Sequence, residues 1–106
     1  MRESEDFSTT IRRGVRAGSP RLVVYVDLTK DSSLVGFVVS RAVGNSVVRH
    51  RVARRLRHIV RELVGSREVG YLVVRALPAA AQASNDELRR DLVTALARAE
   101  RKRVEV

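Results

Sequence analysis

The sequence predicts a small protein of mixed α and β structure, because two different apolar patterns alternate along its 106 residues. The runs 22–28 and 34–40 are almost wholly apolar and rich in β-branched residues, as buried strands are. Residues 46–64 and 85–99 instead carry apolar residues at intervals of three and four, which is typical of helices with one core-facing side. With 44% hydrophobic residues, the chain is expected to form a single domain over residues 1–106.

Four segments are predicted in the N-terminal half. Ser4 can cap a first helix that carries Phe7 and Ile11 on one side and ends at Gly14. Residues 15–20 form a turn or a short edge strand. Because only a short loop separates the apolar runs 22–28 and 34–40, we expect them to pair with each other as an antiparallel hairpin.

The C-terminal half is predicted to contain a helix, a strand and a second helix. Helical spacing begins after the turn dipeptide Gly44-Asn45 and continues to Gly65. A strand follows over residues 69–76, and Leu77-Pro78 ends it. Ser84 and Glu87 have the spacing of a capping box at the start of the last helix. The core-facing residues of this helix are expected to be Leu88, Leu92, Ala95, Leu96 and Ala99.

Positive charge dominates the composition and is concentrated in one segment. Lys and Arg number 21 against 12 Asp and Glu, so the net charge is +9 and the partner is expected to be a polyanion, nucleic acid first. Seven arginines and no acidic residue lie between Arg41 and Arg61. They are Arg41, Arg49, Arg51, Arg54, Arg55, Arg57 and Arg61.

The central helix is predicted to have two unlike faces. At about 100° per residue, its apolar side chains share one sector, which must face the core. They are Val48, Val52, Leu56, Ile59 and Leu63. Most of the arginines, with His50 and His58, fall on the opposite side. Like charges at these spacings repel each other, whereas a phosphate chain would attract them all, so the pattern favours RNA or DNA binding.

The sequence gives little indication of a metal site, a membrane-spanning segment or a catalytic site. Cysteine is absent and there are two histidines, so no metal site is predicted, and no small-molecule substrate is expected. No apolar run approaches the length of a membrane span, and no signal peptide is visible, which favours a cytoplasmic protein without a membrane partner. A nuclease using His50 or His58 is a weaker hypothesis, because no neighbouring carboxylate is evident in the sequence to orient either imidazole.

The segment that carries this charge resembles the signature of the bacterial ribonuclease P protein family. Residues 36–57 read GFVVSRAVGNSVVRHRVARRLR, close to the family pattern G-x-x-V-S-K-K-V-G-N-A-V-x-R-N-R-x-K-R. The similarity continues through Asp6-Phe7, the strand with Tyr25 and the final helix. His50 stands where the family usually has Asn, and Ala53 where it usually has Lys. The basic extension that usually precedes Asp6-Phe7 is nearly absent.

The resemblance implies a fold and a function. The fold is a two-layer α/β sandwich in the order αβββαβα, like the second domain of a small-subunit ribosomal protein. Its four-stranded sheet is mostly antiparallel and contains a left-handed strand–helix–strand crossover. The family assists a catalytic RNA that removes the 5′ leader of precursor tRNA. The protein contributes no catalytic residue and binds no cofactor alone, while the RNA holds Mg²⁺.

Two binding surfaces are implied by matching residues to the family motif. The first would contact the RNA subunit and comprises Arg41, Asn45, Arg49, His50, Arg51, Arg54, Arg55, Arg57 and Arg61. The second is a cleft for the precursor leader, lined by Phe7, Ile11 and Tyr25. The alternative is a ribosomal or other structural RNA-binding protein with a related β-α-β core.

Overall fold

The computed structural model describes residues 10–11, 14–27, 34–65 and 70–105, with the side chains of 103–105 left out. Strand β1 (Val15–Gly18), strand β2 (Leu22–Asp27) and strand β3 (Leu34–Val38) come first. Helix α2 (Ser46–Val64), strand β4 (Tyr71–Ala76), the 3₁₀ helix η1 (Pro78–Gln82) and helix α3 (Asn85–Glu105) complete the order. Thr10 and Ile11 are helical, whereas the rest of the predicted first helix lies outside the described residues.

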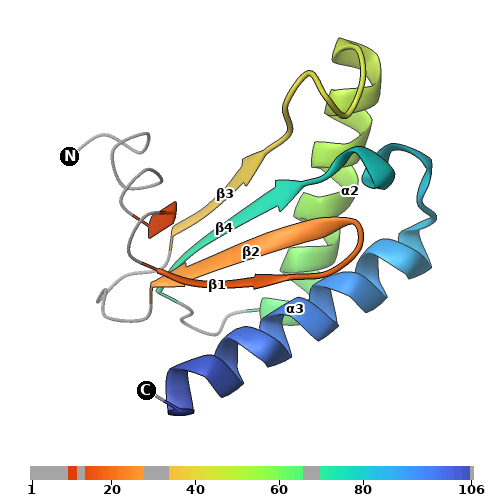
Figure 1. Ribbon diagram of the computed structural model, residues 1–106. Coiled ribbons are helices and arrows are strands. Elements are labelled where there is room, and N and C mark those ends of the chain that lie inside the picture. The colour runs from red at the N-terminus through yellow and green to blue at the C-terminus, as the bar shows by residue number, and fades with distance from the viewer. Residues whose placement is uncertain (1–9, 12–13, 28–33, 66–69, 106) are drawn as a thin grey trace.

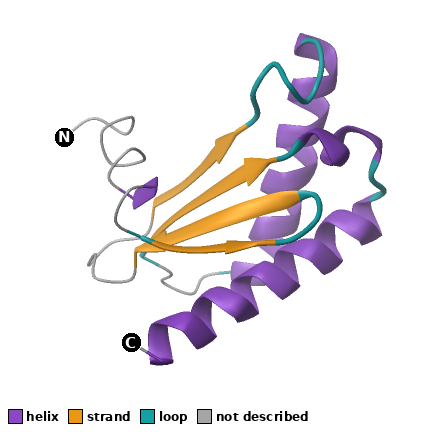
Figure 2. Ribbon diagram, viewed as in Figure 1, coloured by secondary structure: helices purple, strands orange, loops and turns teal. Residues whose placement is uncertain are grey.

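The four strands form one mixed sheet in the order β1-β2-β4-β3. β1 pairs antiparallel with β2, β2 pairs antiparallel with β4, and β3 pairs parallel with β4. Figures 1 and 2 show α2 and α3 packed on one face of this sheet, as in a two-layer sandwich. The predicted α/β class and the mostly antiparallel sheet are thereby confirmed.

The predicted antiparallel hairpin is wrong, because β4 lies between β2 and β3. The apolar pattern identifies extended segments but does not determine which segments pair. β2 and β4 are almost completely buried, so they take the two central positions, and the partly exposed β3 lies at the edge. Strand β1 is the other edge, so of the two alternatives predicted for residues 15–20, a turn or a short edge strand, the structure has the edge strand.

The connection from β3 through α2 to β4 is left-handed, as the family resemblance implied. In Figure 1 the two strands run in the same direction, α2 passes behind the sheet, and β4 lies to the right of β3 when the strands point upward. Most parallel crossovers have the opposite hand. This one brings α2 against the β3 side of the sheet, while α3 covers β1 and β2.

The main core lies between the sheet and the two helices. Leu22, Val24, Leu72 and Val74 contribute from the central strands. The apolar side of α3 supplies Leu88, Leu92, Ala95 and Ala99, all buried as predicted, while Leu96 is half-buried. A second, smaller cluster on the far face of the sheet consists of Val23, Tyr25 and Val73, with Ile11, Val38 and Leu77 against it.

Polar contacts fix the ends of α3. Ser84 and Glu87 form the predicted capping box: the Ser84 amide donates to Glu87 Oε1 at 2.9 Å, and the Glu87 amide donates to Ser84 Oγ at 3.1 Å. Toward the other end, Arg98 donates to the Gly18 carbonyl and Lys102 to the Arg16 carbonyl, which ties the helix to edge strand β1. No helix within the described ranges is long and apolar enough to cross a membrane.

Candidate nucleic-acid interface

Helix α2 begins at a position fixed by one side chain. The Asn45 side-chain oxygen accepts a hydrogen bond from the Val48 amide at 3.0 Å, and the Asn45 carbonyl accepts from the Arg49 amide at 2.9 Å. Asn45 is therefore the N-cap, which satisfies one amide of the first turn. Since every later residue follows at about 100°, this start determines which side chains of α2 face the core and which face outward.

The apolar side of α2 is broader than predicted. Val52, Leu56 and Ile59 are buried, whereas Val48 and Leu63 are only half-buried. The structure also buries two residues outside the predicted set, Val60 and Val64. Both line a depression beside β3, so the second half of the helix packs toward the edge strand as well as the sheet centre.

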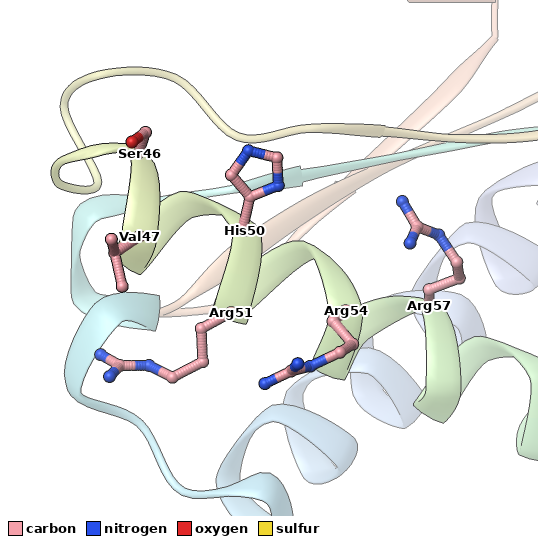
Figure 3. A pocket seen from close by; sticks show the side chains of 6 residues that line it. All are labelled: Ser46, Val47, His50, Arg51, Arg54 and Arg57. Carbon is pink, nitrogen blue, oxygen red and sulfur yellow. The ribbon is translucent and has the colours of Figure 1, made fainter.

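The basic side chains lie on the outer side of α2 and in the turn before it. Arg41, His50, Arg54, Arg57 and Arg61 are exposed, and Arg49, Arg51 and Arg55 are half-buried. An open depression of about 520 Å³ is lined by Ser46, Val47, His50, Arg51, Arg54 and Arg57. Figure 3 shows His50 and Arg57 extending to one side of the helix and Arg51 and Arg54 to the other.

The positive charge of this surface is not neutralised within the described part of the chain. There, no acidic side chain forms an ion pair with any of the seven arginines from Arg41 to Arg61. Two guanidinium nitrogens, Arg49 Nε and Arg51 Nε, are buried and have no hydrogen-bond partner in those same residues. A buried donor without an acceptor lowers the stability of the protein, unless a ligand such as a phosphate oxygen accepts a hydrogen bond from it.

Arg55 differs from the other predicted RNA-binding arginines. Its Nη1 donates to the Ala83 carbonyl at 3.4 Å, in the segment between η1 and α3. The side chain therefore joins α2 to the start of the next helix as well as adding charge. Nothing in the sequence indicated this contact, because Ala83 lies 28 residues further along the chain.

The sequence interpretation that no carboxylate lies near the histidines is wrong for His58. Its Nε2 lies 2.9 Å from Glu62 Oε1, one helical turn away, and Glu62 also pairs with Arg89 of α3. The spacing of four residues could have revealed this contact. Glu62 thus occupies the C-terminal end of the basic surface and pairs with groups from both helices. In the described residues, no three possible metal ligands gather in one place.

The second predicted surface lies on the opposite face of the sheet. Tyr25 is 7% exposed and packs with Val23 and Val73, and the half-buried Ile11 contacts this cluster. Phe7 lies outside the described residues. Sequence reasoning missed Arg75, an exposed residue of β4 whose register partners are Val23 and Val38 of this same face. A single charged residue in an otherwise apolar strand was the available signal.

Comparison with known proteins agrees with the geometry. A sequence model of the Ribonuclease P family matches residues 1–100. A ribonuclease P protein component from Kocuria rhizophila is 54% identical over 104 residues, which cover 96% of this chain and 92% of that protein. One from a Mycobacterium species is 48% identical over 109 residues, which cover 99% and 92%.

Solved structures support the same fold. The ribonuclease P protein from Thermotoga maritima superposes with a TM-score of 0.78 at 25% identity, covering 92% of this chain and 94% of that one. The protein from Staphylococcus aureus gives a TM-score of 0.77 at 21% identity, covering 92% and 91%. From the family match over residues 1–100 and the 54% identity to a relative that is covered over 92% of its length, this chain belongs to the ribonuclease P protein family.

Proposed function

We propose that this chain is the protein subunit of a ribonuclease P and binds the catalytic RNA through the basic side of α2. The observation that carries the proposal is the set of seven arginines from Arg41 to Arg61, which has no acidic partner among the described residues and includes two buried donors without an acceptor there. Guanidinium groups suit this role because they bind phosphate in a bidentate manner and remain charged. The contact residues are Arg41, Asn45, Arg49, His50, Arg51, Arg54, Arg55, Arg57 and Arg61.

The far face of the sheet is proposed to hold the 5′ leader of precursor tRNA. Ile11 and Tyr25 form part of an apolar cluster there, and the exposed Arg75 adds a positive charge beside it. Phe7 is proposed to complete this surface. An apolar patch with aromatic and basic groups is the combination that single-stranded nucleic acid requires.

The chain is proposed to contribute binding and no catalytic group. Hydrolysis of the precursor would take place on the RNA, with Mg²⁺ held by phosphates, and the protein would bind no cofactor of its own. Neutralising phosphates near the RNA core lowers the concentration of Mg²⁺ needed there. The partners are thus the RNA subunit and precursor tRNA, in the cytoplasm, with no membrane and no small-molecule substrate.

Reconstitution at low magnesium tests this function. The purified chain alone should not cut precursor tRNA, and a cognate ribonuclease P RNA alone should cut poorly at low Mg²⁺. Adding the chain to that RNA should restore removal of the 5′ leader. Selective binding of ribosomal RNA, without any such restoration, would instead support the structural RNA-binding alternative.

A further inference from the structure

The side of α2 that faces β3 carries a row of residues four apart: Arg49, Ala53, Arg57 and Arg61. Residues at this spacing lie one above another on a helix, and the row spans about 18 Å. Three of the four are arginines. Ala53 has the one small side chain of the row, so it leaves space between the guanidinium groups of Arg49 and Arg57.

A groove runs along this row between α2 and edge strand β3. Its first half is a depression of about 300 Å³ lined by Phe37, Val39, Arg49, His50, Ala53 and Arg57. Its second half, about 420 Å³, is lined by Val35, Gly36, Phe37, Arg57, Val60, Arg61, Val64 and Gly65. Phe37 and Arg57 line both halves, so the two depressions meet at this pair.

Phe37 and its surroundings combine an aromatic surface with positive charge. Phe37 is half-buried and packs against the main core, and Arg57 Cζ lies over its ring, 5.8 Å from the centroid. Arg49, whose buried Nε has no partner within the described residues, lines the same groove. The Phe37 ring and the planar guanidinium group of Arg57 over it together offer a surface against which a base can pack, and Arg49 and Arg61 offer donors for phosphates of the strand.

We propose that this groove holds an unpaired nucleotide of an RNA strand, with its base in the space at Ala53 against Phe37 and Arg57, and with phosphates of the strand on either side of it on Arg49 and Arg61. The space beside Ala53 is where the base would bind, and Arg49 and Arg57 on either side of it favour a negatively charged chain. The inference deepens the proposed function, on which it rests: α2 would recognise unpaired bases of its RNA partner as well as phosphates.

A planar base, and not charge alone, distinguishes this occupant from a peptide. Because β3 is an edge strand, an extended peptide could in principle add to the sheet here. The groove lining contains three arginines and no acidic residue. An acidic peptide would satisfy the charges but would provide no planar group for the site between Phe37 and Ala53. A peptide is therefore the competing outcome of the test.

The experiment is a titration of the full chain, isotopically labelled at its methyl groups, with short RNA. The probes are hexauridylate and the same hexamer with two central abasic sites, which carry equal charge. We expect hexauridylate to shift the NMR signals of Val35, Val39, Val60 and Val64, which line the groove. The abasic hexamer should bind roughly five- to 150-fold more weakly at these signals, the range for the loss of one stacked base.

Two variants localise the effect to the groove. Ala53→Leu fills the space without changing the charge, and Phe37→Leu keeps an apolar side chain without the ring. Both should reduce the difference between the hexamers to less than about twofold at the groove signals, because stacking is lost. Ala53→Ser is the matched control, since it keeps a small uncharged residue and should preserve the difference. If Phe37→Leu fails to fold, Ala53→Leu alone tests the proposal.

Three results would overturn the proposal. The first is a shift of the Val23 and Val73 signals alone by hexauridylate, which would place RNA on the far face of the sheet. The second is an Ala53→Leu variant that retains the full preference for intact bases. The third is a shift of the groove signals by hexaglutamate at a lower concentration than by hexauridylate, which would assign the groove to a peptide. Failure of the proposed function would look different: the chain would not restore leader removal in reconstitution, whatever the hexamers do.

Discussion

Arg54 and Arg55 are neighbours in the sequence, yet α2 gives their side chains different surroundings. Arg54 is exposed and lines the outer depression, whereas Arg55 is half-buried and donates to the Ala83 carbonyl. At the scale of a residue, the contribution to RNA binding depends on whether the guanidinium group already has a partner in the protein. Charge alone does not separate the two.

Arg54→Ala should lower affinity for ribonuclease P RNA and reduce the slope of log K against log salt by about one, the value for one lost phosphate contact. Arg51→Ala should act similarly. The matched control is Arg90→Ala, an exposed arginine on α3, which should leave the slope unchanged. Binding measured between 50 and 300 mM salt provides the slope. Unchanged slopes in both α2 variants would remove the basis for the RNA interface.

Asn45→Ala should lower the free energy of unfolding by about 1 kcal/mol, because the Val48 amide loses its acceptor at the N-terminus of α2. Asn45→Ser should retain most of the stability, since serine also caps helices well. Urea denaturation followed by circular dichroism measures both. Equal stability of the alanine and wild-type proteins would show that water replaces the cap at no cost.

At the scale of an element, α3 is attached to the β1–β2 turn by a cluster of charged groups. The Arg21 amide donates to Asp91 Oδ2 at 3.0 Å, and its guanidinium group contacts Asp91 Oδ1 at 3.3 Å and Glu87 Oε2 at 2.6 Å. Asp91 is 6% exposed, so its carboxylate requires these donors. The cluster joins residues 70 positions apart.

Asp91→Ala should lower the free energy of unfolding by about 1–3 kcal/mol, because the Arg21 amide and guanidinium group lose their acceptor in a partly buried position. Asp86→Ala is the matched control, because Asp86 is an exposed acid in the first turn of the same helix. Thermal and urea unfolding give the comparison. A loss no larger than that of the control would mean that the cluster has no net stabilising effect.

The capping box predicts a dependence of stability on pH. Hydrogen bonds from the backbone and side chain of Ser84, and then the charge of Arg21, hold the pKa of Glu87 below its ordinary value of 4.5. A lowered folded-state pKa means that this contribution is present above pH 4.5 and is lost as the pH falls through the folded-state pKa. Glu87→Gln should therefore be less stable than wild type at pH 7, and the difference should shrink toward pH 3. A constant difference across that range would contradict this prediction.

At the scale of the whole molecule, positive charge and apolar packing occupy opposite sides of the same helix. The arginines from 41 to 61 account for +7 of the net charge of +9. The left-handed crossover holds the apolar side of α2 against the sheet, so these charges face outward together. A single surface of this kind suits one extended polyanion better than several small anions.

Replacing both histidines by glutamine should preserve leader removal in the reconstituted enzyme, with at most weaker binding of RNA, because we propose that the RNA carries out the chemistry. Gln keeps hydrogen-bonding groups but cannot act as a general base near neutral pH. The measurement is the single-turnover cleavage rate at saturating protein. Loss of that rate, with binding intact, would favour a catalytic role for His50 or for His58 and its partner Glu62.

The sequence by itself determined the elements and the main basic surface. The apolar patterns identified β2, β3, β4, α2 and α3, while residues 15–20, where β1 lies, were predicted only as a turn or a short edge strand. The Ser84–Glu87 spacing predicted a capping box that the structure contains. The motif from Gly36 to Arg57 indicated the family, which the comparisons show. These features are local: each depends on residues within a few turns of one another, where spacing along the chain fixes spacing in space.

Only the tertiary structure decided which distant residues meet. In the structure, β4 lies between β2 and β3, and hydrogen bonds join Arg55 to Ala83 and Arg21 to Asp91. Phe37 and Ala53 line the same depression. Hydrophobic burial stabilises any arrangement that removes apolar surface from water, so by itself it does not determine which strands and helices become neighbours. The strand order and the hand of the crossover depend on burying the apolar faces of the sheet and of both helices together. No single segment of the sequence contains this information.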